Sequence, residues 1–145
     1  MESNNKHIEH QRALDIVKGK MLGKDAFSQW LGIELVEIKP GYCVLQMVIK
    51  EEMLNGFSIA HGGITYSLAD SALAFAANSY GLQAYSIETS ISHTRMLKKG
   101  DIIRAIATEK NRSRQFGIYE VIIIDALDKT VALFKGTVFI TENEW

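Results

Sequence analysis

Residues 53–81 constrain the fold more than any other part of the chain. A polar, glycine-rich segment, residues 53–63, leads into a continuous run that reaches residue 78. Five alanines in this run favour a helix, and their small side chains let other backbone approach closely: Ala69, Ala72, Ala74, Ala76 and Ala77. Gly81 is suited to end the helix in a left-handed conformation. We therefore predict one long helix that contains a single acid, Asp70.

Composition limits the class of protein. A length of 145 residues favours one domain with its own core. The formal net charge of −1 argues against nucleic acid as the main partner. Cys43 is the single cysteine, so no internal disulfide can form, and its apolar surroundings favour an inert thiol. The histidines and the cysteine show no metal-ligand spacing.

The sequence suggests a protein of the cytoplasm. It contains no apolar run long enough to span a bilayer. Residues 1–7 lack the apolar core of a signal peptide. Cytoplasmic localisation is therefore the expectation.

The first 31 residues are expected to form a helical extension. Residues 1–8 are polar, which predicts frayed chain. Apolar residues at helical spacing predict an amphipathic helix over residues 13–22. Asp25 is suited to cap a short helical turn that Gly32 ends. Phe27 and Trp30 in this turn are expected to pack in the core or in a dimer interface.

Six segments have the pattern of β-strands: residues 33–39, 42–50, 84–96, 101–111, 116–125 and 130–141. Short links between them favour antiparallel pairing, which gives an α+β fold. One helix covers one face of such a sheet. The other face is expected to carry apolar residues and so to form a homo-oligomer interface: Val121, Ile123, Val138 and Ile140 are the candidates.

The helix entry has the composition of an anion site. No Ser, Thr, Asp or Asn immediately precedes Gly62 and Gly63, so the first amides of the helix are expected to lack a side-chain cap. Free amides at a positive helix end suit an oxyanion or a polarised carbonyl. The alternative is that the two glycines only shape a turn.

Asp70 is expected to lie on the outward side of the helix. Leu68 and Ala72 fall on the opposite side of the helical wheel, toward the sheet. A solvated acid is the ordinary interpretation. The neighbours of Asp70, however, are small or apolar: Tyr66, Ser67, Leu73, Ala74 and Ala77. Such an acid is unusual if a second subunit covers it.

His61 and Asp70 are too far apart to act on one atom from a single chain. Nine positions correspond to about 13 Å along a helix axis. A common site would therefore combine Asp70 of one subunit with His61, Gly62 and Gly63 of another. Two antiparallel helices across a two-fold axis would produce two such sites per dimer.

Two further side chains in the loop are candidates. Asn55 can bind a ligand or hold the loop through an Asx turn. His61 can orient the loop through its ring nitrogens rather than touch substrate. His93 has no partner that the sequence identifies.

A basic turn, Arg112, Ser113 and Arg114, follows the fourth predicted strand. Two cations and a hydroxyl in a tight turn can bind phosphate. The alternative is a hairpin tip that only faces solvent. Arg95, near the end of its strand, is a similar but weaker candidate.

The sequence resembles the hotdog-fold acyl-CoA thioesterases, and within them the phenylacetate-degradation subgroup. The order of elements matches over about residues 31–140. The residues that carry the resemblance are Met53-Leu54-Asn55-Gly56, His61-Gly62-Gly63, Ser67-Leu68-Ala69-Asp70, Asn78-Ser79 and Gly81-Leu82, with a weaker match at Thr130-Val131-Ala132-Leu133-Phe134-Lys135-Gly136.

The resemblance implies a long central helix wrapped by a curved antiparallel sheet. It implies a homodimer with shared sites, commonly paired into a homotetramer, and no metal or redox cofactor beyond coenzyme A in the substrate. Asp70 would be the catalytic general base or nucleophile. Gly62 or Gly63 would donate an N–H to the thioester oxygen. Asn55 and His61 would shape the site.

The basic turn matches the region where coenzyme A phosphates often lie in this family. Relatives often have an aromatic or apolar residue followed by Leu-Arg-Pro after the strand that follows the helix. This chain has His93-Thr94-Arg95-Met96 there, which leaves the acyl preference open.

The expected function is acyl-CoA hydrolysis, with an aromatic acyl group favoured. Two alternatives remain. One is a hotdog enoyl-thioester dehydratase or hydratase, which uses a different arrangement of a histidine and an acid. The other is an acyl-CoA-binding dimer without catalysis.

Overall fold

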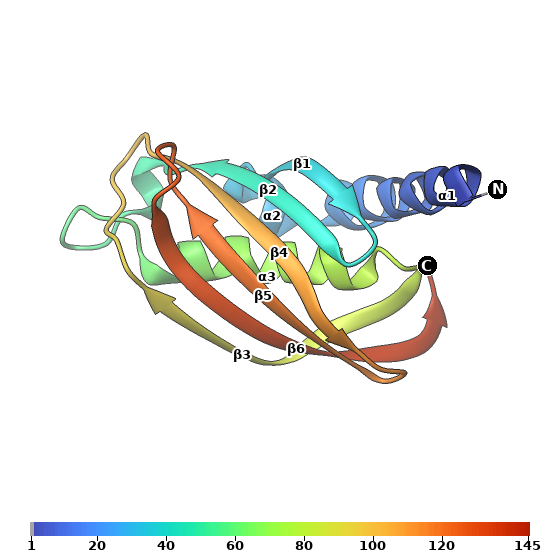
Figure 1. Cartoon of the computed structure of the whole chain (residues 1–145). Helices are drawn as coiled ribbons and strands as arrows, with labels where there is room; N and C mark the ends of the chain where they lie inside the picture. The colour runs from blue at the N-terminus through green and yellow to red at the C-terminus, as the bar shows by residue number, and fades with distance from the viewer. Residues whose placement is uncertain (1) are drawn as a thin grey trace.

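A six-stranded antiparallel sheet curves around one long helix, α3 (Gly62–Asn78), in the computed structural model, which describes residues 2–145 (Figure 1). The strand order is β1-β2-β4-β5-β6-β3. This arrangement confirms the predicted α+β hotdog fold. The strands are β1 (Glu34–Lys39), β2 (Tyr42–Val48), β3 (Leu82–His93), β4 (Ile102–Arg112), β5 (Phe116–Ile124) and β6 (Thr130–Glu144).

Helix α1 (Glu2–Leu14) begins earlier than the sequence suggested and continues as a π-helix, η1 (Asp15–Met21). The prediction that residues 1–8 are frayed is therefore wrong for residues 2–8, while residue 1 lies outside the described part. Glu2 in the first turn and Arg12 in the last turn both complement the helix dipole. No helix within residues 2–145 is long and apolar enough to cross a membrane.

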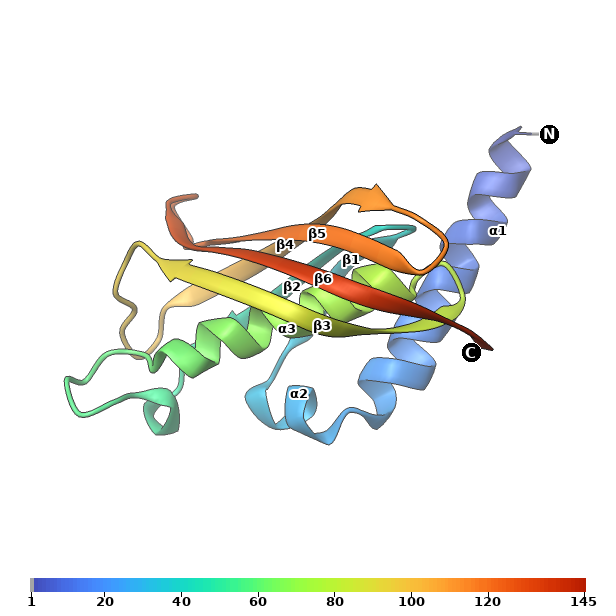
Figure 2. The same cartoon turned by 90° about the horizontal axis from the view of Figure 1, so that it is seen from below.

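A short helix, α2 (Ala26–Leu31), follows the 3₁₀ turn η2 (Leu22–Lys24). The Asp25 carboxylate caps it by accepting the Ser28 N–H at 2.9 Å, and Gly32 ends it with φ +74°, as predicted. Figure 2 shows α2 beside α3, on the side that the sheet leaves open. Phe27 and Trp30 are 52% and 59% exposed, so they do not belong to the core of the chain. Their role in an interface stays a prediction.

Helix α3 is buried on most of its surface, more than a helix on a flat sheet would be. The sheet curls around it, and Gly136 of β6 lies so close that an added Cβ would meet Leu73 Cδ2 at 2.6 Å. The prediction that Leu73 and Ala77 share an open face with Asp70 is wrong, because both are fully buried. A curved sheet covers a wider arc of the helix than the wheel analysis assumed.

The two faces of the sheet are the reverse of the prediction. The four residues expected on the open face all lie in the core against the helix: Val121, Ile123, Val138 and Ile140. Their neighbours Ile122 and Leu133 are directly paired on the outer face and are partly exposed. Alternate strand residues point to opposite faces, so an assignment that is wrong by one residue reverses a whole strand.

Polar contacts of Asn78 fix one end of this core. Asn78, at the end of α3, donates to the Ala84 carbonyl at 2.7 Å and accepts the Ala84 N–H at 2.8 Å, which ties the helix to β3. The Trp145 indole N–H also donates to Asn78 at 2.8 Å.

Cys43 is fully buried in β2, and burial raises the pKa of its thiol, as expected for an inert cysteine.

Gly136→Ala tests the close approach of the sheet to α3. The added methyl overlaps the buried Leu73 side chain, so we expect the free energy of unfolding to fall by about 1–3 kcal/mol in urea denaturation. Gly19→Ala is the control, because nothing lies within 4 Å of its Cβ position. Equal stability of the two variants would contradict the close contact.

Candidate active site

His61 is the N-cap of α3, which changes the expected state of the helix entry. Its Nδ1 accepts the Gly63 N–H at 3.0 Å, and its carbonyl accepts the Ile64 N–H at 2.9 Å. The expectation of uncapped first-turn amides is therefore wrong for Gly63. Histidine is an uncommon cap, so composition alone did not reveal it.

Gly62 keeps a free N–H at this helix end. Within residues 2–145 no hydrogen-bond acceptor is found for it. The peptide bond between His61 and Gly62 is planar, and the Ile64 N–H holds its carbonyl, so the direction of the Gly62 N–H is fixed. Of the two glycines predicted as oxyanion donors, only Gly62 has an amide available.

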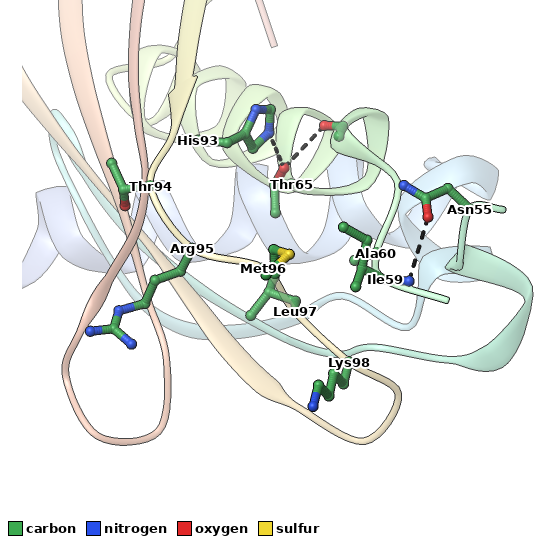
Figure 3. Close-up of a pocket in the computed structure, with 11 residues that line it drawn as sticks. Asn55, Ile59, Ala60, Thr65, His93, Thr94, Arg95, Met96, Leu97 and Lys98 are labelled. Atoms are coloured by element: carbon green, nitrogen blue, oxygen red, sulfur yellow. Dashed lines mark hydrogen bonds between the residues drawn. The ribbon is translucent and has the colours of Figure 1, made fainter. Parts of the chain in front are cut away.

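A cavity of about 790 Å³ borders Gly62. Its wall combines the loop before α3 with the segment that links β3 to β4 (Figure 3). The residues that line it are Asn55, Ile59, Ala60, Gly62, Thr65, His93, Thr94, Arg95, Met96, Leu97 and Lys98. Two of the predicted site residues, Asn55 and Arg95, thus lie with Gly62 around one space.

Asn55 has a role within the loop, in line with the Asx-turn interpretation. Its Oδ1 accepts the Phe57 N–H at 2.9 Å and the Ile59 N–H at 3.4 Å. This geometry holds the loop in its turn ahead of α3. The side chain still borders the cavity, so contact with a ligand stays a prediction.

His93 and Thr65 form a polar pair that the sequence did not reveal. His93 Nε2 lies 2.6 Å from Thr65 Oγ1, and Thr65 Oγ1 donates to the Gly62 carbonyl at 3.0 Å (Figure 3). The bond from Thr65 to the carbonyl three residues earlier is a local pattern that sequence can suggest. The approach of His93 depends on the path of β3, which no local pattern encodes.

Asp70 lies in the middle of α3, facing β3. The Ser86 hydroxyl of β3 donates to Asp70 Oδ1 at 3.4 Å. The carboxyl is partly buried, and this burial raises its pKa, while the Ser86 hydrogen bond opposes the shift. A carboxylate with a raised pKa is a better proton acceptor than a solvated one.

A single chain does not bring Asp70 to the Gly62 cavity. Eight positions of helix separate the two residues by about 12 Å, and Asp70 is not among the cavity-lining residues. Asp70 does lie beside the unpaired edge of the sheet, because β3 is the last strand. Two apolar residues of this edge, Tyr85 and Ile87, are 56% and 55% exposed.

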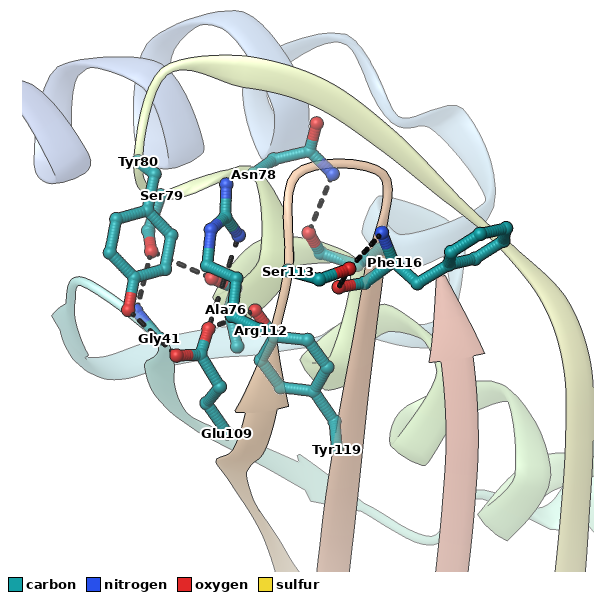
Figure 4. A network of polar contacts seen from close by, with 11 residues as sticks. Gly41, Ala76, Asn78, Ser79, Tyr80, Glu109, Arg112, Ser113, Phe116 and Tyr119 are labelled. Carbon is teal, nitrogen blue, oxygen red and sulfur yellow. Dashed lines mark hydrogen bonds and ion pairs between the residues drawn. The ribbon is translucent and has the colours of Figure 1, made fainter. Parts of the chain in front are cut away.

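The predicted phosphate-binding turn is only partly available for a ligand. The Arg112 guanidinium lies 4.0 Å from the Tyr80 ring centroid and 3.9 Å from Glu109 (Figure 4). Glu109 also accepts the hydroxyl groups of Tyr80 at 3.1 Å and Tyr119 at 2.6 Å. Burial and the Glu109 carboxylate raise the pKa of both tyrosines, so both stay neutral donors.

The other two residues of this turn differ from Arg112. Ser113 accepts the Phe116 N–H at 3.2 Å and so shapes its own turn. Arg114 is almost fully exposed and pairs with Glu142 at 3.0 Å. The turn is at one end of β4, and the other end of that strand, which is near the cavity, is about 33 Å away along the strand. Arg114 is the exposed cation of the three.

No cluster of metal-binding side chains accompanies these groups. Among residues 2–145, no three His, Cys, Asp or Glu side chains lie close enough to hold a metal ion. The chemistry available from the described residues is a carboxylate, backbone N–H groups, an imidazole and surface cations.

Known proteins are similar to this chain in sequence and in architecture. The family model described as the thioesterase superfamily matches residues 57–132. The chain is 39% identical over 116 residues to the acyl-coenzyme A thioesterase PaaI of Escherichia coli K12, covering 80% of this chain and 83% of that one. It is 38% identical to a putative esterase of Archaeoglobus fulgidus, covering 85% and 80% of the two chains.

A solved structure gives the same result for the fold. The E. coli PaaI protein from the phenylacetic acid degradation operon superposes with a TM-score of 0.90 at 34% identity, over 93% of this chain and 97% of that one. The sequence similarity and the similarity of architecture therefore agree. The chain belongs to the thioesterase superfamily.

Proposed function

We propose that this protein hydrolyses acyl-CoA thioesters to a free acid and coenzyme A. The observation that carries the proposal is the unpaired Gly62 N–H, fixed in direction at the positive end of α3 and bordering a cavity of about 790 Å³. A fixed donor of this kind stabilises the negative charge that develops on a thioester oxygen. The similarity to a named acyl-CoA thioesterase supports the same chemistry.

Two copies of the chain form the site in this proposal. Asp70 and Gly62 of one chain are about 12 Å apart along α3, too far to act on one carbonyl group. A long edge strand with exposed apolar residues favours pairing with another strand, and β3 has these properties. Antiparallel pairing of two β3 strands would place the two α3 helices side by side in opposite directions.

The homodimer is the smallest active unit in this arrangement. Association of dimers into a homotetramer would cover further apolar surface. Ile122 and Leu133 on the outer face of the sheet support such a step, because both are partly exposed and directly paired.

Asp70 is the proposed base or nucleophile. Its carboxylate either removes a proton from water as the water oxygen attacks the thioester carbon, or attacks that carbon itself. With water as the nucleophile, the carbon–sulfur bond breaks as the proton taken up by Asp70 passes to the sulfur, so coenzyme A leaves as the thiol and the free acid forms. With Asp70 as the nucleophile, the bond breaks to give an acyl–Asp70 anhydride and the coenzyme A thiolate, which takes a proton from solvent. Water then hydrolyses the anhydride to the free acid and restores the carboxylate. Ser86 holds the carboxylate, Gly62 stabilises the oxyanion, and His61 and Asn55 maintain the loop and the helix entry.

Cations at two places are proposed to attract the phosphates of coenzyme A. Arg95 and Lys98 border the cavity of their own subunit. Arg114 is exposed at the far end of β4 and would serve the partner's site, while Arg112 and Ser113 maintain the turn. An aryl-acetyl group is the proposed acyl group, since the E. coli relative comes from a phenylacetic acid degradation operon.

The two alternatives have less support. A hydratase would need a histidine next to an acid, and the cavity that His93 borders contains no Asp or Glu among its described lining residues. A binding protein without catalysis would not need the raised pKa of Asp70.

Asp70→Asn tests the proposed base. We expect turnover to fall by at least about 100-fold, because the amide cannot accept the proton or attack the carbonyl. Free-thiol release from a panel of aromatic and aliphatic acyl-CoAs measures this. The melting temperature at neutral pH should not fall, since a pKa raised by burial means that the folded state disfavours the charged form.

The matched control is Asp128→Asn, an exposed aspartate in the turn between β5 and β6. Near wild-type turnover in Asp70→Asn would reject the proposed role. If the wild-type protein binds acyl-CoA but releases no thiol from any member of the panel, the binding alternative is correct.

Ser86→Ala tests the environment of the carboxylate. The Ser86 hydrogen bond lowers the pKa of Asp70, so its removal should raise that pKa further. The acid limb of kcat/KM reports the deprotonation of Asp70 and should move to higher pH. Ser90→Ala, also exposed on β3, should leave the pH profile unchanged. An acid limb that moves to lower pH would contradict the assignment.

A further inference from the structure

We propose that His93 contacts the substrate: its Nδ1 accepts a hydrogen bond from the amide N–H of the pantetheine arm that lies nearest the thioester sulfur. The proposal rests on the proposed function, because it concerns how the same site holds a pantetheine thioester. It adds a recognition element for the thiol portion of the substrate, separate from the acyl group.

The contacts of Thr65 determine which nitrogen of His93 carries a proton. The Thr65 hydroxyl has one hydrogen, and the Gly62 carbonyl, 3.0 Å away, can only accept. Thr65 therefore donates to Gly62 and must accept from His93 Nε2 at 2.6 Å. The reverse arrangement would leave two acceptor oxygens facing each other without a proton. A neutral His93 thus carries its proton on Nε2 and presents Nδ1 as an acceptor.

His93 Nδ1 is free and close to Gly62. No hydrogen-bond partner for it occurs among the side chains and backbone of residues 2–145. A Cβ placed on Gly62 would lie 3.2 Å from His93 Cε1 and 3.8 Å from Nδ1. The ring therefore packs against the residue whose N–H is the proposed oxyanion donor, and both border the same cavity (Figure 3).

The position of the cations indicates which part of the substrate passes His93. Arg95 and Lys98 border the same cavity and follow His93 closely in sequence, and Figure 3 shows their side chains extending away from His93 and Thr65. The anionic end of acyl-CoA belongs near these cations, and its thioester belongs near Gly62. The pantetheine arm connects the two, and its end at the thioester lies beside Gly62, against which the His93 ring packs.

The chemistry of this arm matches the free nitrogen. Two methylene groups separate the thioester sulfur from the first amide N–H, which is the hydrogen-bond donor nearest to the reacting carbonyl. A neutral imidazole nitrogen is a suitable acceptor for it. An acceptor is poorly suited to the developing oxyanion, so the role of His93 is to hold the arm rather than to stabilise that charge.

Two thioesters of the same acid test the inference. One is the N-acetylcysteamine thioester, which has the amide N–H, and the other is the 2-acetoxyethyl thioester, in which oxygen replaces that N–H. We expect wild-type kcat/KM to favour the amide by about five- to tenfold, because only the amide can donate a hydrogen bond to the ring nitrogen. His93→Phe keeps a ring beside Gly62 without the acceptor, and its preference should fall to about one.

The controls separate recognition from loss of structure. His10→Phe, on the exposed part of α1, should keep the wild-type preference. Thr65→Val removes the acceptor that holds Nε2 and should weaken the preference, whereas Thr65→Ser should keep it. These two variants also test the inference if His93→Phe does not fold.

The outcomes distinguish the two proposals. Wild-type protein that hydrolyses acyl-CoA but does not prefer the amide thioester overturns this inference alone. The same preference in His93→Phe as in wild type also overturns it. Failure of the wild-type protein to hydrolyse acyl-CoA and both small thioesters overturns the proposed function.

Discussion

The enclosure of α3 by a curved sheet is the constraint on which the other features depend. A helix that is apolar on most of its surface must be covered over a wide arc, and only a strongly bent sheet can do this within one chain. Gly136 permits the closest approach, against Leu73. Asn78 then fixes the far end of the helix to β3. The first turn of α3 is the end left open to a cavity, and this is where Gly62 has its free N–H.

The sequence was sufficient to predict the elements of the fold but not the side of the sheet that the core occupies. The alanine-rich helix, the six strands and the short links between them can all be predicted from local patterns in the sequence. Val121 and Val138 were assigned to the wrong face because each lies in an unbroken apolar run, residues 121–124 and 138–140, in which alternation gives no contrast. The helical state of residues 2–8 was also missed. Their polar side chains are compatible with exposure to solvent both in a helix and in frayed chain, so composition does not distinguish the two states.

Local sequence patterns also predicted only part of the candidate site. Asp70 and Gly62 were proposed as site residues from composition and resemblance, and the distance between them follows from helix geometry alone. The cap formed by His61 was missed because histidine seldom has this role. The engagement of Arg112 with Tyr80 and Glu109, and of His93 with Thr65, joins elements far apart in sequence. Such contacts depend on strand register, which is a property of the whole sheet.

The burial of Cys43 has a consequence for an enzyme whose product is a thiol. Once coenzyme A has been oxidised to its disulfide, it can exchange with an accessible protein thiol, and in that exchange the protein group must attack as a thiolate. Cys43 is fully buried in β2, and its raised pKa keeps it protonated. The chain has no other cysteine. The folded protein therefore offers a coenzyme A disulfide no accessible thiol, and a mixed disulfide at Cys43 would require β2 to leave the sheet.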